Sequence, residues 1–312
     1  MKKGKVLITE PVHELLPKGL VELGFEVVHL PEITRAEALE VIQDFEGLII
    51  NSKVVANREL LLKATQLKFV ARCGSGKEVI DFKYCVENEI IPITSPEGNR
   101  QAVAEHALGM LLSLLNNIHK ASREVAAKKW LREKNRGFEL YAKTIGIIGF
   151  GNTGEAFAEV LRGFNPTILA YDKYRKKFGN NYIVESNLNE IFEHADVLSL
   201  HLPLSEETKY FANQNFFLQF KKPIWFVNTS RGNCVNTKDL LNSIQEEKIL
   251  GAALDVLENE KLETYTDAEN EIFKQLLETG KVLITPHIAG WTHESKRKIA
   301  EVLLQKISEC YR

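Results

Sequence analysis

The stretch TIGIIGFGNTGEAFAEVL (144–161) joins a short apolar run to a cluster of glycines and then to an amphipathic segment. Its glycines follow the pattern G-x-G-x-x-G directly after the apolar run Ile145–Ile148. A glycine cluster between a predicted strand and a predicted helix is typical of a dinucleotide-binding turn. We expect Gly149 to form the tight turn, Gly151 to let the backbone approach a pyrophosphate, and Gly154 to allow close helix–strand packing. The amino end of the helix would offer unpaired N–H groups to the phosphates.

The next predicted strand, Thr167–Tyr171, is followed at once by Asp172. Its distance from the last glycine is close to the roughly 20 residues that separate the acidic residue from the turn in this fold. A carboxylate there can accept hydrogen bonds from the adenosine ribose hydroxyls and would repel a 2′-phosphate. The sequence therefore favours NAD over NADP, although the basic residues Lys173 and Arg175–Lys177 follow closely.

Outward from this segment, short runs rich in Val, Ile and Leu alternate with longer amphipathic segments along most of the chain. Apolar runs without alternation are typical of parallel strands that are covered on both faces. In the first third, the predicted strands are Val6–Thr9, Glu26–Leu30, Gly47–Ile50, Leu67–Ala71 and Ile90–Thr94. In the rest, they are Ile145–Ile148, Thr167–Tyr171, Val197–Leu200, Ile224–Asn228, Ala252–Val256 and Val282–Thr285. We expect an α/β protein with two doubly wound parallel-sheet domains in tandem.

Between the two series, SPEGNR (95–100) is a candidate hinge, and a long helix is predicted over Gln101–Ile118. This helix is apolar on nearly every face, so we expect it to be buried on most sides, either between domains or in a subunit interface. The basic stretch AKKWLREKNR (127–136) is interpreted as a solvated arm.

Composition excludes several classes of protein. The 312 residues contain 40 Lys and Arg against 42 Asp and Glu, a formal net charge of −2, which gives no general reason to bind nucleic acid or an anionic membrane. The four cysteines are scattered, which favours a reduced, cytoplasmic location. The histidines and cysteines lack the spacing of a zinc site, so no metal is expected.

Three polar side chains follow predicted strands: Arg231, Glu260 and His287. The carboxyl ends of parallel strands are where open α/β sheets bind ligands. Singly, they could be a surface ion-pair partner, a solvated loop acid and a capping group.

Together, the three side chains suit hydride transfer to a 2-keto acid. An arginine can hold a carboxylate with two hydrogen bonds and polarise the adjacent carbonyl. An imidazole can protonate the developing alkoxide, and a nearby carboxylate can orient that imidazole and stabilise its protonated form. A serine hydrolase of the G-x-S-x-G type is excluded because the chain lacks this motif.

With these motifs, the sequence resembles the D-isomer-specific 2-hydroxyacid dehydrogenase family over essentially its whole length. The resemblance rests on ARCGSGKEVID (71–81), SPEGNRQAVAEHALGMLL (95–112), TIGIIGFGNTG (144–154), LSLHLPLSEET (198–208), NTSRGNCVN (228–236), GAALDVLENE (251–260) and TPHIAGWT (285–292). It implies an NAD-dependent D-2-hydroxyacid dehydrogenase with Arg231 as substrate clamp, His287 as acid–base residue and Glu260 as its partner. Glu258, in the same loop, is the residue most easily confused with Glu260.

The resemblance also implies the residues that bind the cofactor and the substrate. The NAD contacts, besides the three glycines, fall at Asn152, Thr153, Asp172, Thr229, Ser230 and Asp255. The substrate carboxylate would be held by Arg231 and by backbone groups around Ser75 and Gly76.

The family's fold implies a discontinuous, flavodoxin-like substrate domain over 1–98 and 291–312 and a Rossmann NAD-binding domain over 99–290. The helix after the hinge is a dimer element in the family, which favours an interface role and a homodimer. Since the sequence stops at Arg312, an appended regulatory domain is not expected.

Two other activities stay open. One is 3-phosphoglycerate dehydrogenation in serine biosynthesis, and the other is an NAD-sensing interaction protein like the family's corepressor relatives. Lys77, Glu78 and Val79 depart from the family's usual G-x-G-x-D-N-I-D loop, and Asn51 stands where phosphoglycerate-type relatives often carry an arginine. Arg72 matches another basic position of those relatives.

Overall fold

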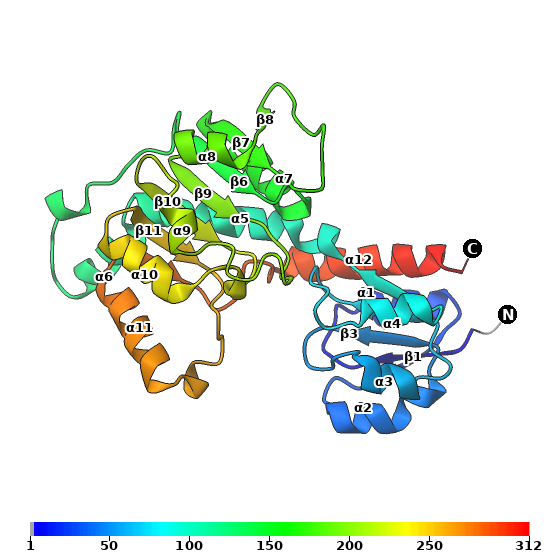
Figure 1. The fold of residues 1–312 in the computed structure, drawn as a ribbon. Helices are drawn as coiled ribbons and strands as arrows, with labels where there is room; N and C mark the ends of the chain where they lie inside the picture. The colour runs from blue at the N-terminus through cyan, green and yellow to red at the C-terminus, as the bar shows by residue number, and fades with distance from the viewer. Residues whose placement is uncertain (1–2, 312) are drawn as a thin grey trace. The chain divides into compact units, whose positions relative to one another are not determined.

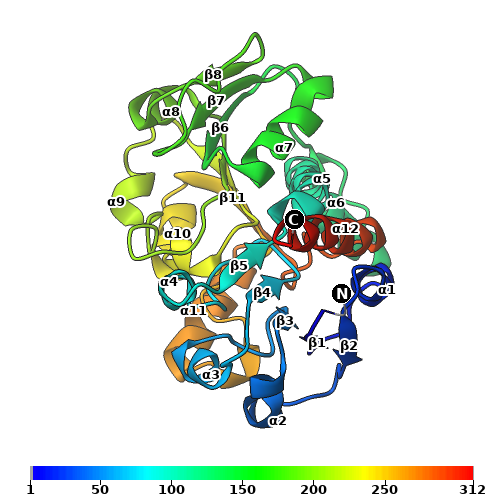
Figure 2. The same cartoon turned by 90° about the vertical axis from the view of Figure 1, so that its right-hand side faces the viewer.

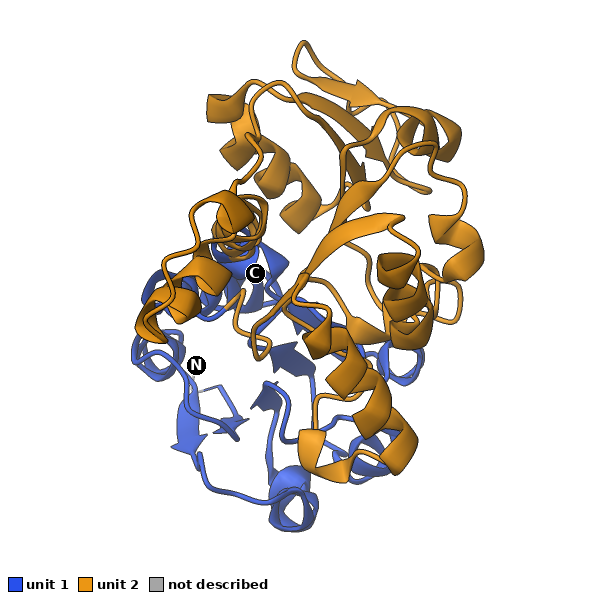
Figure 3. Cartoon of the chain, turned by 90° about the vertical axis from the view of Figure 1, so that its left-hand side faces the viewer, with its two compact units in different colours: residues 1–102, 291–312 blue, residues 103–290 orange. Residues whose placement is uncertain are grey.

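The computed structural model describes residues 3–311, which form two compact units. The first unit runs to Ala102 and resumes at Trp291, and the second spans Val103–Gly290 (Figure 3). The division falls inside a helix, a few residues beyond the position expected at 98.

The first unit (Figure 1) is built on a parallel sheet with strand order β2-β1-β3-β4-β5, whose five strands are labelled in Figure 2. Its strands are β1 (Lys5–Ile8), β2 (Glu26–His29), β3 (Gly47–Ile50), β4 (Phe69–Arg72) and β5 (Ile91–Thr94). Its helices are α1 (Leu15–Glu22), α2 (Arg35–Val41), α3 (Arg58–Lys63), α4 (Phe82–Glu87) and α12 (His293–Glu309). Helices α1 and α12 pack side by side on one face (Figure 2), and α2, α3 and α4 cover the other. All of β3 is buried, as strands covered on both faces require.

The second unit contains a parallel sheet with strand order β12-β11-β10-β9-β6-β7-β8. Its strands are β6 (Thr144–Ile148), β7 (Thr167–Tyr171), β8 (Ile183–Glu185), β9 (Val197–Leu200), β10 (Ile224–Asn228), β11 (Ile249–Leu254) and β12 (Val282–Ile284). Its helices are most of α5 (Pro96–Leu115), α6 (Ile118–Ala126), α7 (Asn152–Val160), α8 (Leu188–His194), α9 (Gln214–Phe217), α10 (Thr237–Gln245) and α11 (Asp267–Glu278). Helices α5 and α7 bury one face, and α8 to α11 the other.

The direction of winding changes at β6, because β7 and β8 lie on one side of it and β9 to β12 on the other. The carboxyl ends of the strands beside such a switch point form the usual ligand site of an open α/β sheet. The prediction of two doubly wound parallel sheets is confirmed. Strand β8 escaped prediction because it is a three-residue edge strand in which only Ile183 is buried.

The turn predicted at 95–100 is wrong, because α5 already begins at Pro96. That the segment acts as a hinge stays a prediction. Proline suits the first turn of a helix, where its missing N–H costs nothing. Close packing requires a glycine at Gly98, since a Cβ there would lie 2.7 Å from the backbone of Ile299. The expected burial of this helix is confirmed by its buried residues Ala102, Val103, Ala104, Ala107, Met110, Leu111, Leu114 and Leu115.

In the single chain, the segment 127–136 is mostly exposed and contains only a short 3-10 turn at Glu133–Asn135. Helix α6, just before it, buries none of its residues. Among residues 3–311, no helix combines the length and the apolar character needed to cross a membrane.

Candidate active site

The glycine turn after β6 has the geometry that its sequence predicts. Gly149 has a φ of +92°, and a Cβ there would lie 2.4 Å from the carbonyl oxygen of His201. At Gly154, a Cβ would lie 2.2 Å from the carbonyl oxygen of Gly149, so only glycine lets α7 start so close to β6. A Cβ at Gly151, by contrast, would meet nothing within 4 Å. The turn is thus closely packed at Gly149 and Gly154 and leaves space at Gly151, where a ligand would approach the backbone.

Asp172 organises this turn from the end of β7. Its carboxylate accepts hydrogen bonds from the backbone N–H groups of Phe150, at 2.8 Å, of Tyr174, at 2.9 Å, and of Arg175, at 2.8 Å. Burial alone would raise the pKa of Asp172, but these bonds and the charge of Lys176 outweigh it and lower the pKa. Asp172 therefore joins the turn after β6 to the turn after β7 as an ionised group.

The residues around the turn fit a dinucleotide. Helix α7 begins at Asn152 and Thr153, and no side chain caps its amino end, so its first N–H groups are available for phosphate oxygens. The hydroxyl of Thr229 is buried and has no hydrogen-bond partner among residues 3–311. A buried polar atom of this kind is expected where a ligand completes the hydrogen bonding.

The turn after β10, which carries Arg231, is shaped by Asn228. The side-chain oxygen of Asn228 accepts from the N–H of Ser230 at 3.0 Å and from its hydroxyl at 2.7 Å. Its side-chain nitrogen donates to the carbonyl oxygen of Arg231 at 3.0 Å. The predicted cofactor residue Ser230 therefore directs its hydroxyl toward Asn228, which sequence analysis did not single out. The signal available in the sequence was an amide side chain at the last position of a buried strand.

The loops of Arg231 and Glu260 pack against each other. A Cβ at Gly232 would lie 1.9 Å from the carbonyl oxygen of Leu257, so the two backbones approach as closely as glycine permits. Glu258 caps the start of α10 by accepting a hydrogen bond from the N–H of Thr237. Glu258 is therefore engaged at the start of α10, whereas Glu260 contacts a different residue.

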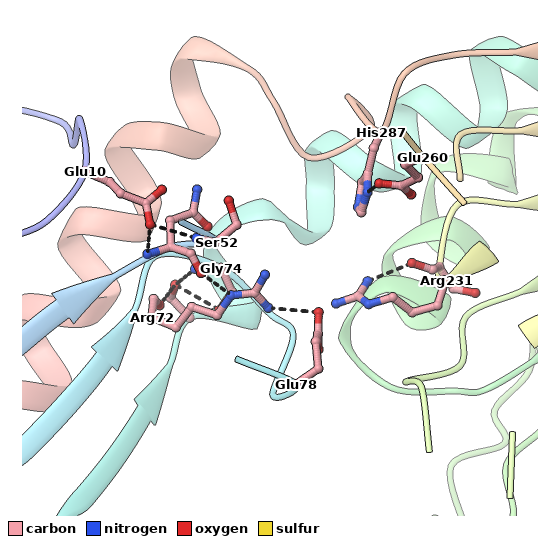
Figure 4. Close-up of polar contacts among 11 residues, drawn as sticks. Glu10, Ser52, Arg72, Gly74, Glu78, Arg231, Glu260 and His287 are labelled. Carbon is pink, nitrogen blue, oxygen red and sulfur yellow. Dashed lines mark hydrogen bonds and ion pairs between the residues drawn. The ribbon is translucent and has the colours of Figure 1, made fainter. Parts of the chain in front are cut away.

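The residue that Glu260 contacts is His287. Its Nδ1 lies 2.9 Å from Oε2 of Glu260, and both side chains are a little less than half exposed (Figure 4). His287 has a φ of +54°, a conformation that is uncommon for a residue with a side chain and that clusters at functional sites. The structure thus brings two of the predicted catalytic residues into direct contact.

Asp255 holds the loop of His287 in place. Its side chain is 1% exposed and accepts from the hydroxyl of Thr285 at 2.6 Å and from the N–H groups of Ile288 and Ala289 at 2.9 and 2.8 Å. The N–H of His287 itself donates to the carbonyl oxygen of Asp255 at 2.8 Å. Sequence reasoning singled out Asp255 as a cofactor contact, and missed its role as the support of this loop.

His106, on α5, extends the same network. Its Nε2 lies 3.0 Å from the hydroxyl oxygen of Thr285 and 3.5 Å from the carboxylate of Asp255. Neither His106 nor Thr285 was singled out from the sequence, because their positions in the chain do not indicate that they meet.

In the first unit, the predicted carboxylate-binding residues Ser75 and Gly76 lie in the loop after β4. The loop is fixed at its start by the N–H of Gly74, which donates to the hydroxyl of Ser95 at 3.0 Å. At its end, the N–H of Ala56 donates to the carbonyl oxygen of Val79 at 2.8 Å. Residues 3–311 contain no group of three or more His, Cys, Asp or Glu side chains arranged to hold a metal ion.

Comparison with known proteins agrees with this geometry. Residues 108–289 match the family model described as D-isomer specific 2-hydroxyacid dehydrogenase, NAD binding domain. The D-3-phosphoglycerate dehydrogenase of Methanocaldococcus jannaschii is 32% identical over 99% of this chain and 57% of its own length. The hydroxypyruvate reductase of Thermotoga maritima is 30% identical over 97% of this chain and 98% of its own length.

Among solved structures, the D-lactate dehydrogenase of Aquifex aeolicus in complex with NAD and lactic acid superposes with a TM-score of 0.81. It is 26% identical, and the match covers 97% of this chain and 94% of the other. The chain spans just over half the length of the phosphoglycerate dehydrogenases it matches in M. jannaschii and in Bacillus subtilis. The chain belongs to the D-isomer specific 2-hydroxyacid dehydrogenase family and carries the NAD-binding domain of that family in its second unit.

Proposed function

We propose that this protein is an NAD-dependent dehydrogenase that interconverts a D-2-hydroxyacid and the corresponding 2-keto acid. The observation that carries the proposal is the contact between His287 and Glu260, on a loop that the buried Asp255 holds in an uncommon backbone conformation. An uncommon backbone conformation costs free energy and clusters at functional sites. A histidine held there, with its ring oriented by a carboxylate, is typical of an acid–base residue.

His287 is the proposed proton carrier. Glu260 accepts the hydrogen bond from Nδ1 and thereby fixes the orientation and the tautomer of the ring. Nε2 is then the atom that donates a proton to the alkoxide formed in reduction, or removes the hydroxyl proton in oxidation. The bound nicotinamide supplies or accepts the hydride.

Arg231 is the proposed substrate clamp, because its guanidinium can hold a carboxylate with two hydrogen bonds and polarise the adjacent carbonyl. Its Nη1 donates to the carbonyl oxygen of Ser230 at 2.7 Å, which restricts the side chain. In the first unit, we propose that backbone groups around Ser75 and Gly76 also bind the substrate carboxylate.

We also propose which residues bind the NAD cofactor. The turn Gly149–Gly154 and the start of α7, with Asn152 and Thr153, would hold the pyrophosphate. Asp172 would accept from the adenosine ribose, and Thr229, Ser230 and Asp255 would lie near the nicotinamide end.

We also propose a homodimer in the cytoplasm. Helix α6 and the segment that follows expose the large side chains Ile118, Val125, Trp130, Phe138 and Tyr141, a set that a second copy of the chain would cover. All four cysteines are free thiols, as a reducing compartment allows.

The test is a panel of 2-keto acids assayed with NADH and NADPH by nicotinamide absorbance: glyoxylate, hydroxypyruvate, pyruvate and phosphohydroxypyruvate. We expect NADH-dependent reduction of at least one acid and weaker activity with NADPH. The absence of turnover with every acid, combined with NAD-dependent binding to another protein, would favour an NAD-sensing role instead. The identity to phosphoglycerate dehydrogenases over nearly the whole chain keeps a phosphorylated substrate as a second candidate.

A further inference from the structure

The carboxyl edge of the sheet in the first unit contains an anion-binding loop that the chain fills with its own carboxylate. Oε1 of Glu10, which follows β1, accepts hydrogen bonds from three consecutive backbone N–H groups, those of Asn51, Ser52 and Lys53, at 2.9, 2.8 and 2.9 Å (Figure 4). Successive N–H groups that converge in this way form a nest that suits a phosphate or carboxylate. Glu10 is only 9% exposed, so a ligand would have to displace a buried side chain to use this nest.

The arginine at the same edge also has an internal carboxylate partner. Arg72 ends β4, and its side chain is only 11% exposed. Its Nε donates to the carbonyl oxygen of Asn51 at 3.1 Å, and its Nη1 lies 3.4 Å from Oε1 of Glu78. Figure 4 shows this contact between Arg72 and Glu78. Glu78 belongs to the loop of Ser75 and Gly76, and its side chain is the more exposed of the two.

The two lysines of these loops are directed to other parts of the first unit. Nζ of Lys53 donates to the carbonyl oxygen of Pro31 at 2.5 Å. Nζ of Lys77 lies 5.4 Å from the centre of the Phe82 ring, a cation–π distance. Lys53 and Lys77, the lysines of these two loops, therefore already make contacts within the first unit.

We propose that Glu78 and Glu10 make the edge formed by Arg72 and Asn51–Lys53 selective for 2-keto acids whose only anionic group is the carboxylate beside the carbonyl. The proposal rests on the proposed function and names its substrate class. A phosphate or second carboxylate held beside Arg72 and the backbone of Asn51–Lys53 would face the charge of Glu78, and it would have to compete with Glu78 for Arg72 and with Glu10 for the N–H groups. A neutral distal group, such as a hydrogen or a hydroxyl, meets no such competition.

The decisive experiment compares kcat/KM for hydroxypyruvate and phosphohydroxypyruvate, which differ only in the phosphate, in the wild type and in Glu78→Gln. Glutamine keeps the size of the side chain and removes its charge. The matched control is Glu40→Gln, an exposed position on α2 that changes the net charge equally. Since Glu78 is exposed, the variant should fold, which circular dichroism verifies.

We expect the wild type to prefer hydroxypyruvate at least tenfold. In Glu78→Gln, the ratio of kcat/KM for phosphohydroxypyruvate over hydroxypyruvate should rise about tenfold, mainly through a lower KM for the phosphorylated acid. Glu40→Gln should keep the wild-type ratio. A wild type that prefers phosphohydroxypyruvate, or a ratio unchanged in Glu78→Gln, would overturn the inference and leave the dehydrogenase activity standing. A protein that reduces neither of these acids, nor glyoxylate or pyruvate, would instead overturn the proposed function.

Discussion

The imidazole of His287 lies 2.9 Å from the carboxylate of Glu260, although the two residues are 27 positions apart in the chain. The contact depends on a loop with an uncommon backbone conformation, because His287 has a φ of +54°. Asp255 supplies the support through hydrogen bonds from Thr285, Ile288 and Ala289. The proposed acid–base pair thus relies on a third, buried residue.

Asp255→Asn should damage both stability and catalysis. An amide has one acceptor oxygen, so at least one of the three donors loses its partner in a buried site. A hydrogen bond to a charged group contributes about 1.5–3 kcal/mol, and we expect the free energy of unfolding to fall by about that amount. Denaturant unfolding and kcat measure the two effects. Asp267→Asn changes an exposed carboxylate in the first turn of α11; it should lower the free energy of unfolding by less than about 1 kcal/mol and leave kcat unchanged. Equal stability of both variants would contradict the account.

Asp172→Asn should weaken NAD binding about tenfold, and by the same factor at pH 7.5 and pH 5. Backbone hydrogen bonds and Lys176 outweigh the effect of burial and hold the pKa of Asp172 below its ordinary value of 3.8, so its carboxylate stays ionised over this range. Its contribution to stability is likewise present above pH 3.8 and is lost only as the pH falls through the lower, folded-state pKa. Calorimetric titration of both proteins with NAD⁺ is the measurement. A difference in affinity that disappears at pH 5 would show that the pKa of Asp172 is raised rather than lowered.

His201 should make the fold acid-sensitive. Burial lowers its pKa to about 3, from an ordinary value of 6.5. Below pH 6.5 the unfolded chain therefore binds a proton that the folded chain does not, and stability falls by up to about 1.4 kcal/mol per pH unit toward pH 3. The slope of the unfolding free energy between pH 6.5 and 4 should decrease in His201→Gln. The exposed control His194→Gln should keep the wild-type slope, and identical slopes in both variants would argue against a buried neutral imidazole.

Trp130→Glu should convert the proposed dimer to a monomer. The Trp130 side chain is 76% exposed beside α6, and a charge there would be buried without a partner if a second copy covers it. Sedimentation velocity gives the oligomeric state directly. Trp291→Glu, at an equally exposed tryptophan of the first unit, is the matched control and should stay dimeric. A wild type that sediments as a monomer would rule out the dimer.

The sequence predicts the fold well because its strands are continuous apolar runs. Gly47–Ile50, Thr167–Tyr171, Val197–Leu200 and Ile224–Asn228 are strands with the predicted bounds. The turn expected at 95–100 is wrong because proline and glycine break helices in general, whereas Pro96 begins α5 and Gly98 packs against α12.

For the site, the sequence indicates which residues follow strands, but not which of them meet. Arg231, Glu260 and His287 could be named because each follows a strand closely. Glu10 could not be connected with the loop at Asn51, 41 positions away, because a hydrogen bond from a carboxylate to backbone N–H groups leaves no pattern in the sequence. The network of His106 with Thr285 was hidden for the same reason, since 179 positions separate them.

His287→Ala tests the central claim most directly, with kcat and the affinity for NADH measured on the same preparation. Acid–base catalysis contributes typically 10²–10⁴-fold, so we expect kcat for the best 2-keto acid to fall by about that factor. The dissociation constant for NADH should stay within about twofold of the wild type, because the glycine turn and Asp172 lie outside the changed loop. Undiminished turnover in His287→Ala would contradict the assignment of His287 as the proton carrier and the mechanism built on it.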